Sequence, residues 1–194
     1  MKNSHFFLLV ITSFFAVNGL AQSSLEAHVH GEAELLIAIE SDTISMQFVS
    51  PAANIYGFEH KPKNEEQRRR IIESKAAFSR PNDLFEFTGA NCETVHSFVN
   101  APFADEATSD RSHHEEHDHS DHGDHGDHGD HKEDTHVEVT AEYEFKCDST
   151  EISAIKALFL NQFPAIESLD AQWVMQGSQG AKELSGSDID INLR

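Results

Sequence analysis

The chain has 194 residues, and its 34 acidic residues against 14 lysines and arginines give a formal net charge of −20 at pH 7. A surface with this charge repels nucleic acids and anionic membranes and attracts cations, so we do not expect a nucleic-acid-binding protein. The length is that of one domain or two small ones. Beyond the N-terminal segment, no stretch approaches the roughly 20 apolar residues that a membrane span needs.

The N-terminus is predicted to be a secretory signal peptide. A short charged start precedes an apolar run from Phe6 to Val17, and a small-x-small site ends at Ala21. This arrangement predicts that residues 1–21 are cleaved and that residues 22–194 are exported as a single domain. The run is too short for an ordinary transmembrane helix. The alternative is an N-terminal helix buried in the fold.

A β-hairpin with one buried face is predicted between residues 28 and 50. Apolar residues occupy alternate positions on both sides of Ser41-Asp42, as expected for strands. Pro51 ends the second strand because proline cannot donate to a sheet ladder. The alternating apolar residues are Leu35, Ile37, Ile39, Ile44, Met46 and Phe48.

A helix is predicted over residues 64–79, and it ends before Pro81. Asn64 and Gln67 have the spacing of a capping box, and two glutamates begin the segment, where they suit the helix dipole. The run Arg68–Arg70 is interpreted as a solvated face of this helix.

Strands and a second helix are predicted in the rest of the chain. The best strand covers residues 136–147, where apolar and polar residues alternate. The second helix is predicted over residues 149–162, with Asp148 and Glu151 as its cap pair, and Trp173 is assigned to the core. Further strands are predicted over residues 83–87, 90–99, 169–175, 181–184 and 189–193. The fold class is therefore α+β, with a mainly antiparallel sheet, two helices and one long disordered insertion rich in histidine and aspartate.

The insertion contains the most informative feature of the sequence, which we call the histidine tract. Nine of the 14 histidines lie between residues 113 and 136, where no aliphatic or aromatic side chain is present to be buried. We therefore predict a disordered loop at about residues 101–135. Asp-His-Gly repeats from Asp121 onward, and the glycines keep the backbone flexible. The tract histidines are His113, His114, His117, His119, His122, His125, His128, His131 and His136.

This concentration of imidazoles indicates metal binding. Neutral histidine is a common ligand for late first-row divalent cations, whereas calcium and magnesium prefer oxygen. With two or three histidines per ion, the tract could hold about two to four zinc ions. Each would bind with modest affinity, because binding must order the loop. The alternative is that the tract has no role in metal binding and is a solvated low-complexity linker or a pH-responsive segment.

A second group of histidines lies outside the loop. His28 and His30 would project from the same face of a strand, about 7 Å apart, close enough to share one ion. His60 follows a short aromatic stretch, and His136 begins the best strand. If these segments lie close together, their histidines form a more rigid site than the loop. Taken singly, each is better explained as a surface or hydrogen-bonded residue, whereas the His28–His30 pair fits that explanation and a metal site equally well. His96 is interpreted as structural.

Cys92 and Cys147 are the only cysteines. In an oxidising compartment two cysteines usually pair, so we predict a disulfide that closes a loop containing the whole tract. By the chain-entropy model this bridge is worth about 4 kcal/mol. A thiolate metal site is the alternative, but neither cysteine has a second one at metal-ligand spacing.

Familiar enzyme motifs are missing from the sequence. It contains no His-Glu-x-x-His, no Gly-x-Ser-x-Gly and no phosphate-binding glycine loop. Its paired glutamates also occur in solvated settings. We therefore expect a protein without enzymatic activity.

Several motifs resemble the ZrgA-like periplasmic zinc-uptake proteins of Gram-negative bacteria. They are HVHGEAELLIAIE at residues 28–40, SPAANIYGFEH at 50–60, the histidine-rich insertion, YEFKC at 143–147 and Phe163-Pro164. The likeness covers nearly all of the mature chain. It implies a periplasmic protein that binds zinc and assists its import alongside an ABC-type zinc transporter. It also implies that His28, His30, His60 and the tract are the candidate ligands.

The sequence thus favours a non-enzymatic periplasmic protein that scavenges or buffers zinc and supports its uptake. The loop would collect ions, and a scaffold site would hold one. A nickel or copper handling protein is the alternative in the same class, because these metals accept the same ligands. A structural or interaction module with a histidine-rich spacer is the alternative from another class.

Overall fold

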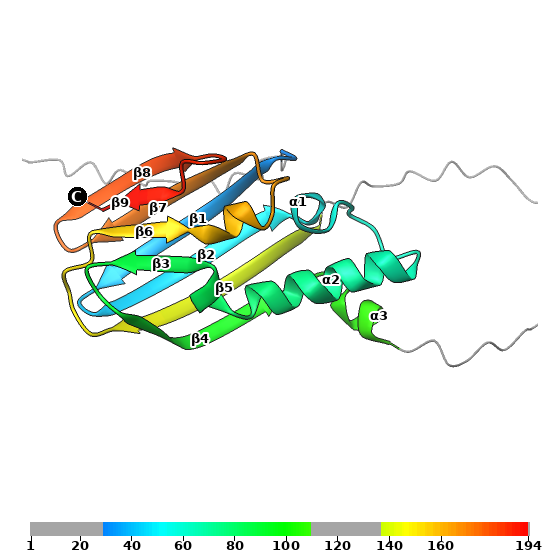
Figure 1. Cartoon of the computed structure of the whole chain (residues 1–194), viewed down its shortest axis with the longest axis horizontal. Coiled ribbons are helices and arrows are strands. Elements are labelled where there is room, and N and C mark those ends of the chain that lie inside the picture. Colours follow the sequence, from blue (N-terminus) through cyan, green and yellow to red (C-terminus); the bar gives the residue numbers. More distant parts are fainter. Residues whose placement is uncertain (1–28, 110–136, 194) are drawn as a thin grey trace, which may run out of the picture.

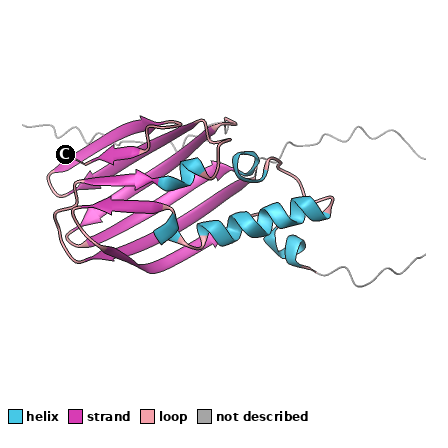
Figure 2. Ribbon diagram, in the orientation of Figure 1, coloured by secondary structure: helices cyan, strands magenta, loops and turns pink. Residues whose placement is uncertain are grey.

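The computed structural model describes residues 29–109 and 137–193; the predicted signal peptide, His28 and the tract histidines lie outside these residues. The described chain forms two layers, with a six-stranded sheet on one side and a three-stranded sheet with helices on the other (Figure 1, Figure 2). The large sheet has the order β4-β5-β2-β1-β7-β8, with β1 Glu32–Glu40, β2 Thr43–Pro51, β4 Cys92–Asn100, β5 Glu138–Cys147, β7 Ser168–Met175 and β8 Ser178–Leu184. The small sheet has the order β3-β6-β9, with β3 Phe85–Thr88, β6 Ala154–Ala157 and β9 Asp190–Asn192.

The predicted hairpin is confirmed and forms the centre of the large sheet. β1 and β2 pair antiparallel, with Ile37 opposite Met46, and all six of the predicted apolar positions are buried. β5 lies beside β2 and alternates as predicted, with Tyr143 and Phe145 in the core. Only β1 and β7 pair in parallel in this sheet, so it is mainly antiparallel.

The small sheet packs against one face of the large sheet through aromatic rings. The ring of Phe85 in β3 lies 5.8 Å from that of Tyr143, and Phe87 lies 4.9 Å from Phe145, measured between centroids. Such pairs contribute about 0.5–1.5 kcal/mol each beyond the area that they bury. Trp173 is partly buried and packs against the same core, in agreement with its predicted place.

The prediction of a helix over residues 149–162 is wrong. This segment contains β6 and then the short 3-10 helix Leu158–Asn161. Ile155 and Ala157 are buried in β6, which pairs with β3 on one side and β9 on the other. Because a short apolar run fits a strand as well as a helix, the available sheet partners decide the structure.

The first predicted helix is confirmed as α2, Glu65–Phe78. The Asn64 side chain accepts a hydrogen bond from the Gln67 backbone N–H at 2.9 Å, so the predicted cap forms. The arginine run pairs with glutamates of the same helix, as Arg70 does with Glu66 at 2.7 Å. This pairing agrees with a solvated face.

The sequence pattern predicts neither of two further short helices. α1, Ala52–Tyr56, follows β2 directly, and α3, Ala104–Thr108, packs on α2. α3 falls within the predicted loop, whose start at about residue 101 is therefore too early; the buried Ala104 and Ala107 anchor this helix. Residues 110–135 of that loop lie outside the described residues. Within residues 29–109 and 137–193, no helix is long and apolar enough to cross a membrane.

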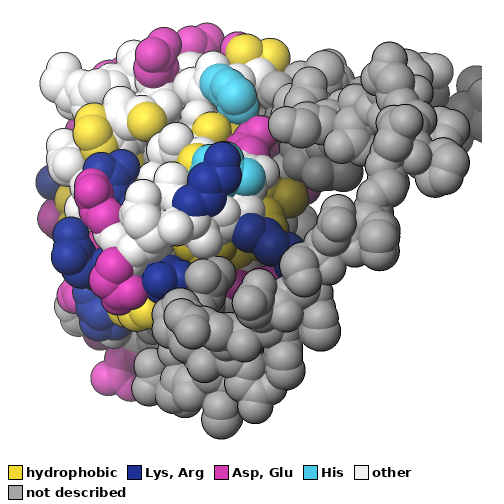
Figure 3. Space-filling view, turned by 90° about the vertical axis from the view of Figure 1, so that its right-hand side faces the viewer, with side chains coloured by type: hydrophobic (Ala, Val, Ile, Leu, Met, Phe, Trp, Pro, Cys, Tyr) yellow, Lys and Arg dark blue, Asp and Glu magenta, His cyan; other side chains and the backbone are white. Residues whose placement is uncertain are grey.

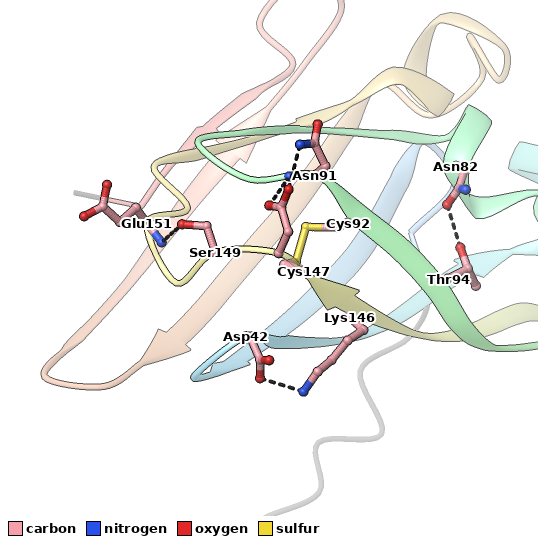
Figure 4. Close-up of a disulfide and its surroundings, with 10 residues drawn as sticks. Asp42, Asn82, Asn91, Cys92, Thr94, Lys146, Cys147, Ser149 and Glu151 are labelled. Atoms are coloured by element: carbon pink, nitrogen blue, oxygen red, sulfur yellow. Dashed lines mark hydrogen bonds and ion pairs between the residues drawn. A yellow bond between two sulfur atoms is a disulfide. The ribbon is translucent and has the colours of Figure 1, made fainter.

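The predicted disulfide is confirmed. Cys92 of β4 and Cys147 of β5 are directly opposite each other and are bonded through their sulfurs (Figure 4). Beside them, Asp148 accepts hydrogen bonds from the Asn91 side chain and backbone N–H, both at 2.8 Å. These bonds hold the pKa of the Asp148 carboxyl below its usual value. Their contribution to stability is therefore present at neutral pH and is lost as the pH falls through that lowered pKa.

Candidate metal site

Two of the described histidines, His30 and His60, lie where β1 begins and α1 ends. His30 precedes β1 by two residues, and His60 lies four residues after α1. Figure 3 looks onto this end of the molecule, where histidine side chains reach the surface among acidic and basic groups. The third described histidine, His96, lies in β4 opposite Glu144.

The buried side chain of Asn54 in α1 fixes the backbone that carries His30. Its Oδ1 accepts a hydrogen bond from the Gly31 N–H at 2.8 Å. Its amide donates to the Glu32 carbonyl at 2.8 Å and to the Ser50 hydroxyl at 3.2 Å. Asn54 is only 4% exposed, so its polar groups depend on these partners. Asn54 therefore ties the start of β1 to α1.

The turn after α1 positions His60. Gly57 caps the C-terminal end of α1, and its φ of +85° favours glycine. The ring of Phe58 then stacks on the His60 ring with centroids 5.0 Å apart, and the His60 Nδ1 lies 2.9 Å from the Lys61 carbonyl oxygen. A carbonyl oxygen only accepts hydrogen bonds, so Nδ1 carries the hydrogen. In the neutral ring the lone pair is then on Nε2, the nitrogen suited to a metal.

Glu59 adds a carboxylate to this group. Its Oε1 lies 3.4 Å from the Nε2 of His30, and its side chain is 16% exposed. A carboxylate beside an imidazole fixes the orientation and tautomer of the ring, and here it favours a lone pair on Nδ1. A carboxylate can also bind zinc directly. Glu59 therefore suits either role.

The described residues that flank the histidine-rich segment in the sequence lie at this end of the molecule. The backbone N–H of Ala52 in α1 donates to the carbonyl of Val137 at 2.8 Å, and Val137 directly follows His136 in the chain. On the other side, α3 packs on α2, and its Glu106 lies 3.4 Å from Lys61, the neighbour of His60. The described residues on the two sides of the segment, α3 before it and Val137 after it, therefore both contact elements at this end.

Of the predicted ligands, the structure describes His30 and His60, which lie at the same end of the molecule. Within the two described ranges, no group of three or more His, Cys, Asp and Glu side chains is arranged to hold a metal ion. His28 and His136 adjoin this end in sequence but lie outside the described residues, as do the histidines from His113 to His131. Their ligand roles stay predictions.

Sequence reasoning missed Asn54 and Glu59. A polar residue within the short apolar segment Ala52–Tyr56 is a signal that could have indicated a buried hydrogen-bonding role for Asn54. Glu59 directly precedes His60, but its partner is His30, and only the tertiary structure reveals this pairing.

Replacing Asn54 with alanine will lower the free energy of unfolding by about 2–3 kcal/mol, because the buried Gly31 N–H and Glu32 carbonyl lose their partner. Urea denaturation measures this effect. Asn82→Ala is the matched control, since the exposed Asn82 makes one surface hydrogen bond, to Thr94. Equal losses in the two variants would contradict the anchoring role of Asn54.

The family of the chain follows from comparison with known proteins. A model of the ZrgA family zinc uptake proteins matches residues 27–193. The chain belongs to the ZrgA family. No curated protein matches the sequence. The resemblance seen in the motifs is thus confirmed for nearly the whole mature chain, and the ZrgA assignment links the protein to zinc uptake. The geometry around His30 and His60 is therefore a candidate zinc site of a ZrgA protein.

Proposed function

We propose that this ZrgA family member is a periplasmic zinc-binding protein, without enzymatic activity, that captures zinc and supports its import. The family supports the link to zinc uptake, and the predicted signal peptide supports export. Cleavage after Ala21 removes Lys2 and no acidic residue, which takes the formal charge from −20 to −21. Such a charge attracts cations.

In this proposal the two groups of histidines have different tasks. The tract binds ions with modest affinity and releases them quickly, because each ion must order the loop. His30 and His60, joined by His28, bind one ion more tightly, because the fold already holds the backbone of His30 and His60. Glu59 orients His30 or supplies an oxygen ligand.

The contacts of the residues that flank the tract, at the end of the molecule that carries His30 and His60, are the observation that carries this proposal. A tether keeps the effective concentration of its ligands high near its two ends. Ions released by the tract would therefore be recaptured by the scaffold site. From there zinc would pass to an import system, and an ABC-type zinc transporter is the partner that we propose.

The double variant His30→Ala/His60→Ala tests the scaffold site in the full mature chain. We expect the tightest zinc affinity to fall by about tenfold or more, as for the loss of ligands that a fold holds in place. Competition with a chromophoric chelator measures this affinity. His96→Ala is the control, because it removes one histidine in β4 and should leave the tightest affinity unchanged.

Two results would decide against this function. If the double variant binds its first zinc ion as tightly as the wild type, His30 and His60 are not ligands. If nickel or copper occupies the tightest site while zinc is present at the same free concentration, the protein handles another metal.

A further inference from the structure

No element formed by residues 29–109 and 137–193 packs on one face of the large sheet, which we call the uncovered face. The small sheet and the helices pack on the opposite face (Figure 1, Figure 2). The uncovered face carries a shallow groove of about 940 Å³, which crosses β5, β2, β1, β7 and β8 and is also lined by His96 of β4. An antiparallel sheet with one solvated face normally presents polar side chains there. This face differs from that pattern by an apolar strip, and its charged residues are mostly acidic.

First, an apolar strip runs along the middle of the groove. Ala38 of β1 is paired with Val174 of β7, and Leu36 lies two residues along β1 on the same face. Ala181 of β8 is paired with Gln172 and so lies diagonally beside Val174. Leu36 is 42% exposed and Val174 is 53% exposed. Single exposed apolar residues are ordinary, but a contiguous group in a groove indicates an interaction surface.

Second, acidic residues border the strip on two sides. Glu142 and Glu144 lie on β5, in register with Gln47 and Ser45 of β2. The rest of the acidic border occupies directly paired positions on β1, β7 and β8; these residues are Glu34, Asp170 and Glu183. Like charges opposite each other destabilise a sheet, so this arrangement lowers the stability of the isolated chain. Among the described residues of this face, the only lysine or arginine is Lys146, whose side chain pairs with Asp42 at 2.7 Å.

We propose that this face docks a protein partner that presents apolar side chains flanked by lysine or arginine. Such a partner covers the apolar strip and neutralises the acidic border. A second copy of the chain would place acids against acids. The tract is also a poor occupant, because residues 110–136 contain ten acidic residues against Arg111 and Lys132. The proposal does not depend on zinc binding, and it suits a protein that must deliver its cargo to another.

Synthetic peptides provide a direct test with the mature full-length protein. The probe is a fluorescent peptide of alternating leucine and lysine, and its binding is measured by anisotropy. Two matched peptides replace its leucines with serine or its lysines with glutamate. We expect both to bind at least about tenfold more weakly than the probe, because each removes one of the two complementary features.

Variants locate the binding on the protein. Leu36→Ser/Val174→Ser should weaken binding of the probe by about tenfold, and Glu142→Gln/Glu144→Gln should do the same and reduce its salt dependence. All four positions line the groove. Ile72→Ser is the control for the first variant, since Ile72 is 41% exposed on α2, and Glu73→Gln is the control for the second. Circular dichroism verifies that every variant is folded.

Three results would overturn the proposal. If the serine-substituted peptide binds as tightly as the probe, the peptides are held only by the negative charge of the protein and the apolar strip is not used. If Ile72→Ser or Glu73→Gln weakens probe binding as much as the groove variants do, the probe does not bind at this face. Sedimentation of the wild type as a dimer that Leu36→Ser/Val174→Ser dissociates would show that a second copy is the occupant.

Discussion

Replacing the eight histidines from His113 to His131 with asparagine will remove most of the zinc that the mature protein holds at neutral pH. Asparagine keeps the length and charge of the segment but lacks the imidazole nitrogen that binds metal. With two or three histidines per ion, the loss should be about two to four zinc ions per chain. About one ion should remain, on the scaffold. Equilibrium dialysis followed by metal analysis gives both numbers.

The matched control replaces the acidic residues of the same segment with their amides. Carboxylates support histidine ligands through hydrogen bonds and can complete the coordination of zinc, so we expect this variant to lose affinity but to keep most of its zinc. An unchanged zinc stoichiometry in the histidine variant would mean that the tract is a spacer. The protein would then resemble an interaction module more than a zinc collector.

The second large effect concerns the disulfide. Replacing Cys92 and Cys147 with serine will lower the free energy of unfolding by about 4 kcal/mol, because the bridge restricts an unfolded loop that spans 55 positions. Urea denaturation of the zinc-free protein measures the change. It is large against the roughly 5–15 kcal/mol that stabilises an ordinary domain.

A reducing agent supplies the control for this prediction. It should lower the unfolding midpoint of the wild type to that of the double serine variant, and it should leave the variant unchanged. If the reductant leaves the wild-type unfolding midpoint unchanged, the disulfide does not stabilise the fold. The disulfide lies where β5 ends, whereas the tract joins where β5 begins, so the folded variant should keep its zinc stoichiometry.

The elements that could be predicted are those whose pattern is long and has a single interpretation. β1, β2 and β5 alternate over nine or ten residues with one buried face, and α2 has a capping pair and a proline stop. Each of these signals lies within one segment of the chain. The pairing of Cys92 with Cys147 was equally constrained, because the chain offers no other cysteine.

The elements that could not be predicted depend on distant partners. The apolar residues around Ile155 fit a helix, but β3 and β9 offer strand partners on both sides. α1 and α3 have five residues each and are held by packing, since helices this short gain little from local propensity. The parallel pairing of β1 with β7 joins segments far apart in the sequence.

The candidate metal ligands also divide into those that the sequence predicts and those that depend on distant parts of the chain. A dense group of histidines can bind metal without a preformed fold, so composition alone indicates the chemistry of the tract. The scaffold site depends on geometry that no pattern displays. Asn54 fixes the backbone beside His30, and Glu59 faces His30 rather than its neighbour His60.

Zinc retention by the mature protein at two pH values tests most directly the claim that histidine imidazoles bind the metal. Purified protein without any tag is dialysed against dilute zinc at neutral pH and at about pH 5, and its zinc is measured at each. Free imidazoles have a pKa of about 6.5 and must lose their proton to bind, so several ions should be retained at neutral pH and few at the lower pH. A chain that holds no zinc at neutral pH, or equal amounts at both, would contradict the account.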